Sequence, residues 1–263
     1  MSSSVSGRQK AVILIPKVGG FISLFCSSFI LGHVCMSNQR RSNMYHRILA
    51  LMSASDMVGS TIFVLSSWPI PQETGIYLAS GTVDSCEVVG FVNQIVAILT
   101  PAYNVSLVLY YYLTIAQGLR PGEMCKYQYY LYFVPLVYAL AMAIPGLPLD
   151  LYNAANFVCW IAPYPPGCQG NEFERGHNYA VRKQEQVVRK YAGGGSGMKH
   201  SRRVANQGLL YVIVFFLTFI PGTMTRLRQM TTGQVEYWII ITMTIFLPLQ
   251  GFFNLIAYRY VPL

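Results

Sequence analysis

Six apolar runs, each long enough to cross a bilayer as a helix, dominate this 263-residue chain. Apart from Lys17 and Asp56 they contain no Asp, Glu, Lys or Arg. About 20 apolar residues in a helix span the roughly 30 Å hydrocarbon core with every backbone group bonded internally. The sequence therefore predicts an all-α fold, a polytopic transmembrane helix bundle. The expected spans are residues 11–36, 48–68, 88–116, 128–149, 208–225 and 237–258.

The composition also argues against a soluble fold. Hydrophobic residues make up 53% of the chain and charged residues only 11%, and the net charge is +9. The basic residues stand in short clusters beside the spans rather than on one polar face, so we expect no nucleic-acid partner. They favour contact with the anionic lipid heads of a lipid bilayer instead. We expect the whole chain, residues 1–263, to form one transmembrane domain.

Loop charges orient the predicted bundle, because Lys and Arg concentrate in short cytoplasmic loops. Loop 37–47 carries three arginines, among them Arg40 and Arg41, and no acid, whereas loop 69–87 carries three acids and no base. Loop 117–127 is again basic. The first loop is therefore predicted inside and the N-terminus outside, in a membrane that we expect to be the plasma membrane.

The long segment after the fourth span contradicts itself about its side of the membrane. Residues 149–180 hold three acids against one base, together with two cysteines, whereas residues 181–203 hold seven basic residues against one acid. No apolar run separates these two parts. We therefore expect that a transmembrane helix is missing between Gly176 and Ala180. Six spans then remain of an ancestral seven, and residues 181–206 form a basic cytoplasmic-type loop.

An even number of spans leaves two arrangements open for the end of the chain. In one, the last two spans are inverted, which places Arg259 outside, against the charge rule. In the other, some segment crosses the membrane without being apolar.

Three of the six cysteines, Cys86, Cys159 and Cys168, fall on the predicted outer side. Disulfides form in that oxidising environment, and three thiols allow one pair and one spare. Cys86 begins the third span and Cys159 lies in the outer loop after the fourth, so a bridge between them would clamp adjacent helices. We expect this pair, with Cys168 as the alternative partner.

Asp56 is the strongest single signal for function. A carboxylate in mid-span costs about 2.5 to 3.5 kcal/mol unless it is paired, solvated or protonated. Asn254 of the last span is the best distant amide partner, and it shares a helix face with Tyr258, four residues later. These three residues predict a polar switch, and a satisfied structural carboxyl is the alternative. Prolines inside the spans, such as Pro221, predict kinks.

Five stretches of the sequence carry a family resemblance. They are MYHRILALMSASD (44–56), SSWPIP (66–71), PAYNVSLVLYYYL (101–113), GLPLDLYNAANFVCWIAPYP (146–165) and PLQGFFNLIAY (248–258). In this order they resemble the G-protein-coupled receptors, and most closely the cyclic-AMP-receptor-like branch of microbial eukaryotes. The resemblance covers the chain apart from the fifth transmembrane helix.

The resemblance implies a function and partners. A protein of this family would transduce the signal of an extracellular small-molecule or peptide ligand to a heterotrimeric G protein, and loss of one helix would impair it. The residues that would face the G protein are Arg40, Arg41, Arg120, Arg182 and Lys183.

The resemblance also implies roles for individual residues. Cys86 and Cys159 would form the disulfide between the third helix and the outer loop, and Asp56 would be the polar centre of the second helix. The run from Asn254 to Tyr258 is similar to the family's Asn-Pro-x-x-Tyr switch, with a leucine in place of the proline. The helix kink of the family's sixth helix would fall at Phe219 and Pro221.

A six-span channel or transporter is the alternative from another functional class. It would predict two related halves or several pore-facing charges, whereas the sequence has no internal repeat and a single central acid. His-Glu-x-x-His and Gly-x-Ser-x-Gly motifs are absent, and the four histidines are scattered. We therefore expect no enzymatic activity, no cofactor and no metal site.

Overall fold

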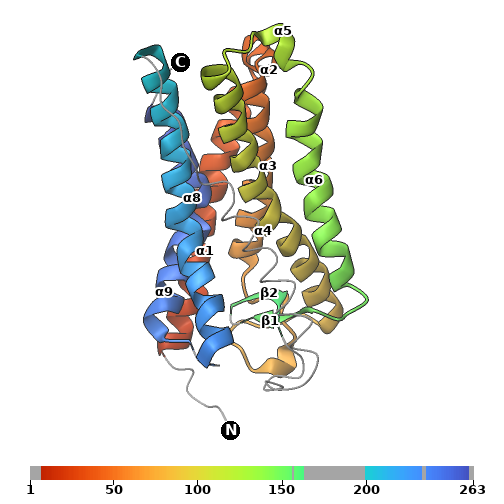
Figure 1. Ribbon diagram of the computed structural model, residues 1–263. Coiled ribbons are helices and arrows are strands. Elements are labelled where there is room, and N and C mark those ends of the chain that lie inside the picture. Colours follow the sequence, from red (N-terminus) through yellow and green to blue (C-terminus); the bar gives the residue numbers. More distant parts are fainter. Residues whose placement is uncertain (1–6, 156, 163–198, 233–234, 261–263) are drawn as a thin grey trace.

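A computed structural model describes residues 7–155, 157–162, 199–232 and 235–260. Within these ranges the chain is a bundle of long helices with one short hairpin at the end where α1 begins, called here the N-terminal end (Figure 1). Six helices are long and apolar enough to cross a membrane, which confirms the predicted polytopic bundle. They are Gly7–Cys35, Met44–Leu65, Val83–Ile115, Gly122–Gly146, Gly208–Arg228 and Tyr237–Arg259.

The described elements follow one another along the chain, with the longest interval between β2 and α8. The first half contains α1 (Gly7–Cys35), α2 (Asn38–Ser42), α3 (Met44–Leu65), η1 (Gln72–Thr74), α4 (Val83–Tyr111) and the π-helical turn η2 (Tyr112–Ala116). The second half contains α5 (Pro121–Met124), α6 (Gln128–Ala143), η3 (Ile144–Gly146), β1 (Tyr152–Ala155), β2 (Val158–Ile161), α8 (Lys199–Thr232), α9 (Tyr237–Phe246), η4 (Leu247–Leu249) and α10 (Gln250–Tyr260).

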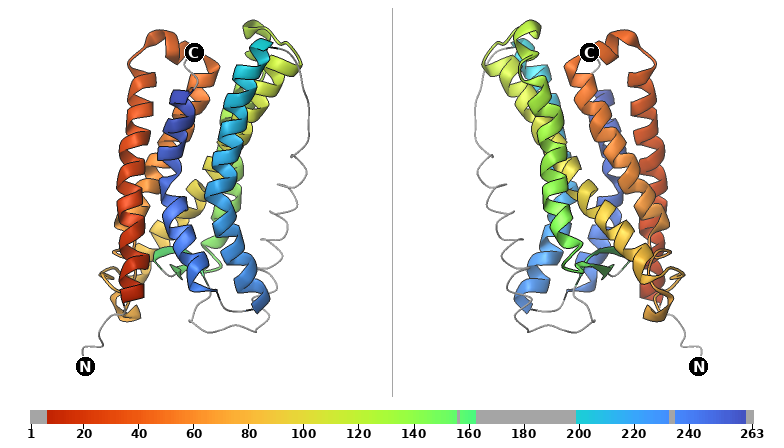
Figure 2. Two further views of the ribbon diagram at one scale, coloured as in Figure 1. Left: turned by 90° about the vertical axis from the view of Figure 1, so that its left-hand side faces the viewer. Right: turned by 90° about the vertical axis from the view of Figure 1, so that its right-hand side faces the viewer.

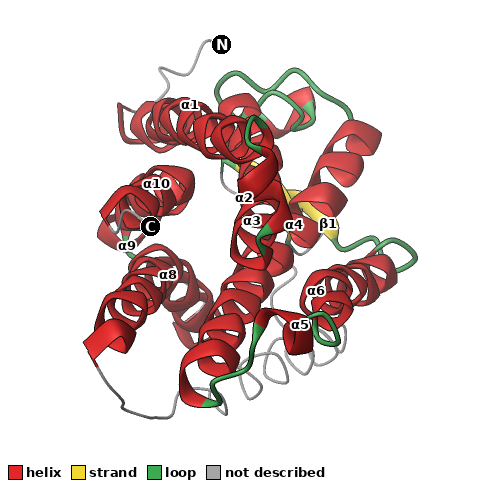
Figure 3. Cartoon of the chain, turned by 90° about the horizontal axis from the view of Figure 1, so that it is seen from above, coloured by secondary structure: helices red, strands yellow, loops and turns green. Residues whose placement is uncertain are grey.

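The helices form a ring around a packed interior (Figure 3). Helix α1 packs against α3 and α10, α3 packs against α4, and α4 and α10 both contact α8, which closes the ring. Helix α4 also carries α6 on its outer side and both strands at its N-terminal end. The antiparallel hairpin β1–β2 pairs Ala154 with Cys159, and it is an addition to the all-helical prediction.

The direction of α8 excludes one of the two arrangements that the sequence leaves open, the inversion of the last two spans. Helix α8 begins at the end of the bundle that holds α2, called here the α2 end, and runs to the N-terminal end (Figure 2). Near its end, Arg226 contacts Ile161 of the hairpin, and nearer its start Tyr211 contacts Tyr45. The last span therefore returns to the α2 end, where Arg259 lies over the ring of Phe29.

Of the two arrangements that the sequence leaves open, the inverted one, with Arg259 at the same end as the N-terminus, is therefore not the one observed. The hairpin β1–β2 and the start of α8, which flank residues 163–198, lie at opposite ends of the bundle (Figure 1). Residues 163–198 lie outside the described residues. They contain the expected junction between Gly176 and Ala180 and the basic loop 181–206 up to residue 198. Helix α8 thus runs in the same direction as α6.

Small residues let the first helix approach its neighbours closely, as is common between membrane helices. A Cβ atom on Gly20 would lie 2.9 Å from Ser60 O of α3, and one on Gly251 would clash with the Ser27 side chain. The Gly251 backbone N–H donates to the Ser23 hydroxyl at 2.8 Å. The packing of α1 against α3 and α10 therefore depends on residues without large side chains.

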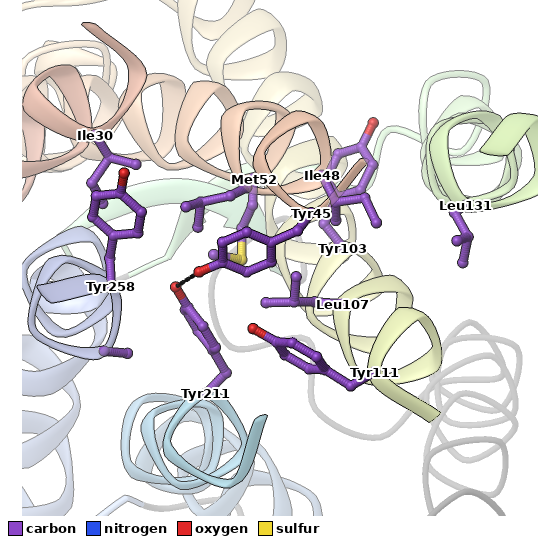
Figure 4. Packing of buried hydrophobic residues seen from close by; sticks show 12 residues of the cluster. Ile30, Tyr45, Ile48, Met52, Tyr103, Leu107, Tyr111, Leu131, Tyr211 and Tyr258 are labelled. Atoms are coloured by element: carbon purple, nitrogen blue, oxygen red, sulfur yellow. Dashed lines mark hydrogen bonds between the residues drawn. The ribbon is translucent and has the colours of Figure 1, made fainter. Parts of the chain in front are cut away.

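The interior near the α2 end is a cluster of aromatic and aliphatic side chains (Figure 4). Tyr45 of α3, Tyr111 of α4 and Tyr211 of α8 point toward one another at its centre. The Tyr45 and Tyr211 hydroxyl oxygens lie 3.3 Å apart, within hydrogen-bond reach. Other members come from α1, α6 and α10, so the cluster joins all the described spans. Members from these three helices and further members from α3 and α4 are Ile30, Ile48, Leu49, Met52, Tyr103, Leu107, Leu131, Ala257 and Tyr258.

Candidate functional site

Asp56 lies in the middle of α3 with its side chain only 4% exposed. Asn254 Nδ2 of α10 donates to its Oδ2 atom at 2.7 Å, and the Thr100 hydroxyl of α4 donates to Oδ1 at 3.2 Å. The contact with Asn254 is the one expected from the sequence. Because each donor comes from a different helix, the carboxylate joins three spans, and these bonds offset its burial in the hydrocarbon region.

Thr100 is a partner of Asp56 that the sequence did not indicate. Its hydroxyl also lies 3.0 Å from the Ser55 hydroxyl, which in turn donates to the Met52 carbonyl. A single threonine in an apolar span gives no signal by itself, since its partner is 44 residues away. Only the packing of α3 against α4 brings it to the carboxylate.

Several buried polar atoms in the spans have no hydrogen-bond partner within the described part of the protein. They include Asn254 Oδ1, both side-chain polar atoms of Gln250, Ser53 Oγ and Ser27 Oγ. Unpaired buried polar groups are costly and are usually satisfied by neighbours or by ordered water. These groups can therefore take new partners if the helices shift.

Tyr258, the third residue of the predicted polar switch, does not bond to Asp56 or Asn254 in this structure. Its hydroxyl lies 2.7 Å from His33 Nδ1 of α1, and its ring meets the His46 ring edge-on. Tyr258 is one helical turn beyond Asn254 toward the α2 end. The residues of the predicted switch therefore form two separate contacts, one between Asp56 and Asn254 and one between His33 and Tyr258. The sequence did not indicate the second contact, because its histidines are scattered.

The predicted bridge between Cys86 and Cys159 is present, with the sulfurs bonded and the Cα atoms 5.3 Å apart. A capping box positions Cys86, because Thr82 and Ser85 satisfy each other's backbone N–H groups at the start of α4. The bridge holds the hairpin against α4. Cys168, the alternative partner, lies outside the described residues.

The hairpin is bonded to α4 and α8 by polar side chains as well. Asn93 Nδ2 donates to the Cys159 carbonyl at 3.2 Å, and Trp160 Nε1 donates to Gln94 Oε1 at 2.6 Å. Arg226 donates to the Ile161 carbonyl at 3.0 Å, and its guanidinium lies 4.4 Å from the centre of the Trp160 ring. A movement of the hairpin would therefore act directly on α8.

Tyr152 fixes the other strand of the hairpin. Its hydroxyl donates to the Ala143 carbonyl at 2.5 Å, and a side chain on either Gly90 or Gly146 would collide with it. Burial raises the pKa of Tyr152 to about 12. The hydroxyl therefore remains a hydrogen-bond donor throughout the physiological pH range.

Lys17, the other charged residue within a predicted span, reaches the end of α3. Its Nζ atom donates to the carbonyls of Val64 and Leu65 at 3.0 and 2.7 Å and lies 4.5 Å from the centre of the Trp68 ring. The last carbonyls of a helix lack intrahelical partners and attract cations. Ser66 ends α3 with a positive φ of 48°. Lys17 is thus a helix-capping residue.

The residues predicted to face a G protein lie at the α2 end where they are described. Arg40 donates to the His33 carbonyl at 2.7 Å, Arg41 bonds to the Asn38 side chain, and Arg120 precedes α5. Arg182 and Lys183 lie outside the described residues. The predicted kink residues Phe219 and Pro221 lie within the continuous helix α8, where the Thr225 hydroxyl donates to the Pro221 carbonyl at 2.9 Å.

Comparison with models of known protein families and with curated proteins gave no match. The class of the protein is therefore defined by its fold. Six apolar helices of membrane length, with the carboxylate of Asp56 bonded in their interior, make the chain a multi-span helical membrane protein.

Proposed function

We propose that the protein is a receptor of the G-protein-coupled type, which binds a ligand at its N-terminal end and contacts a heterotrimeric G protein at its α2 end. The observation that carries this proposal is the buried Asp56 carboxylate, bonded by Asn254 of the last span and Thr100 of the third. An intramembrane carboxylate shared by three helices is by default a functional feature. The Cys86–Cys159 bridge supports the same proposal.

Helix α8 can couple the two ends mechanically. Near the N-terminal end Arg226 binds the hairpin, and 15 residues earlier Tyr211 contacts Tyr45, so the two contacts are about 22 Å apart along the helix. A ligand that binds better when the hairpin and α8 have shifted would also favour separation of the tyrosine pair. Asn254 Oδ1, which has no hydrogen-bond partner among the described residues, would then be able to accept a hydrogen bond.

The charges support an orientation with the N-terminal end outside. Helix α2 and its neighbours at the α2 end carry Arg40, Arg41, Arg47, Arg120, Lys126 and Arg259 against Glu123 within the described ranges. At the N-terminal end, described basic residues are balanced by acids such as Glu73 and Glu87. An excess of Lys and Arg is typical of the cytoplasmic side. The basic α2 end would thus face the G protein, in the plasma membrane.

We further propose that the protein acts by binding and conformational change rather than by catalysis. The ligand is a small molecule or a peptide that reaches the hairpin from the N-terminal end.

The test is complex formation with a purified heterotrimeric G protein, measured with the full-length chain in lipid nanodiscs. We expect a complex that forms without nucleotide and dissociates when GTPγS is added. The Tyr211→Phe variant should change its affinity because the Tyr45 contact is lost, whereas Tyr129→Phe, on the exposed face of α6, should not. Absence of any GTPγS-sensitive complex across the Gα subfamilies would contradict the proposal, and ion flux through liposomes containing the protein would favour the channel alternative.

A further inference from the structure

An apolar groove of about 360 Å³ runs between α1 and the last span on the outer surface of the bundle. Its lining comes from one face of α1 and from the region around η4. The helices meet closely there, because a Cβ atom on Gly19 would lie 3.1 Å from Pro248 Cβ. The lining residues are Leu14, Ile15, Val18, Gly19, Ile22, Ile245 and Leu249.

The chemistry of the groove matches a hydrocarbon chain. No polar or charged side chain belongs to its lining. Val18 is 63% exposed, and Leu14, Ile22 and Ile245 are also exposed on its rim. Exposed apolar surface on a membrane protein faces lipid. A concave surface holds an acyl chain in more contacts than a convex helix surface does, because dispersion contacts add atom by atom.

A cation lies beyond the groove at the N-terminal end. Arg8, Ile15 and Ile22 are seven residues apart and therefore share one face of α1. The rise of a helix places Arg8 about 10 Å beyond Ile15, toward the membrane boundary. Its guanidinium lies 5.3 Å from the centre of the Tyr237 ring at the start of α9. The neighbouring acid, Glu236, lies 3.7 Å from Arg228.

We propose that the groove is a binding site for one glycerophospholipid, with an acyl chain between α1 and the last span and the phosphate at Arg8. An arginine beside a phenol forms charge-assisted hydrogen bonds to phosphate, and the apolar groove continues along the same helix face. A sterol carries no negative charge, so its hydroxyl would gain less from Arg8 than a phosphate does. The bound lipid fills the groove along the Gly19–Pro248 contact and so holds α1 against the last span.

The probe is phosphatidylglycerol with a photoreactive group in its acyl chain, added to the purified full-length protein in nanodiscs, followed by peptide mapping. We expect labelling on peptides that contain residues 14–22 and 245–249. Val18→Trp should fill the groove and abolish this labelling. Val137→Trp is the matched control, since Val137 on α6 is also 63% exposed.

The headgroup is tested with Arg8→Gln, and Lys10→Gln is its control because Lys10 also lies over a ring, that of Tyr77, at the N-terminal end. A basic residue near anionic lipid contributes about 1 kcal/mol, so Arg8→Gln should lower labelling about fivefold. Equal labelling of all exposed spans would mean bulk lipid only and would overturn the proposal. Labelling by a photoreactive sterol that is insensitive to Arg8→Gln would also overturn it.

Discussion

Replacing Asn254 by leucine removes the shorter of the two described hydrogen bonds to the Asp56 carboxylate, which measures 2.7 Å. A hydrogen bond to a charged group contributes about 1.5 to 3 kcal/mol to folding stability, and truncating one partner leaves the other buried and unsatisfied. Thr100 keeps its weaker bond at 3.2 Å. We therefore expect Asn254→Leu to lower the free energy of unfolding by about 1.5 to 3 kcal/mol.

The same substitution should have little effect once the carboxylate is gone. In an Asp56→Leu background no acceptor remains, so Asn254→Leu should be close to neutral, and the double-mutant cycle should give a coupling of at least about 1.5 kcal/mol. Unfolding of the purified protein in detergent measures the four free energies. Asn93→Leu is the matched control, because Asn93 is buried on α4 but bonds to the hairpin.

The changes in the free energy of unfolding caused by Asn93→Leu, the control, and by Asp56→Leu should add. Asn93 lies seven residues from Thr100, about 10 Å along α4, and distant sites add within about 0.5 kcal/mol. If the unfolding free-energy changes of Asp56→Leu and Asn254→Leu also add, the Asn254 amide does not stabilise the Asp56 carboxylate. The account of Asp56 as the centre that joins three helices would then be wrong.

Three further predictions concern the two ends of the bundle. Non-reducing peptide mapping should find Cys86 joined to Cys159, and replacing both by serine should lower stability by at most about 4 kcal/mol, the entropy of closing a loop of 73 residues; alkylation of both thiols in the native protein would refute the bridge. Lys17→Met should cost about 1 kcal/mol because the last carbonyls of α3 lose their cation, whereas Lys17→Arg should keep most of the stability. Epitope tags after Leu263 and within loop 37–47 should lie on the same side of the membrane, so antibodies should reach both tags or neither tag in intact cells, and both after permeabilisation. If only one of the two tags is reached in intact cells, α8 runs the other way.

The sequence by itself determined the features that depend on local composition. Six apolar runs of sufficient length predict six spans, because each helix satisfies its own backbone in the membrane. Cysteine placement favoured the bridge between Cys86 and Cys159 among three predicted outer cysteines, and Cys168 was the alternative partner. Asp56 and Asn254 were recognisable because polar groups are conspicuous in apolar segments.

Only the tertiary structure decided which groups meet across helices and how the last spans run. The direction of α8 depends on its contacts at both ends, through Tyr211 and Arg226, and the residue count of the apolar runs contains no information about it. Thr100, His33 and the carbonyls bound by Lys17 are ordinary residues or backbone atoms in the sequence. They acquire their roles because packing brings them to a buried charge or phenol, and a polar group away from water must find a partner wherever the fold supplies one.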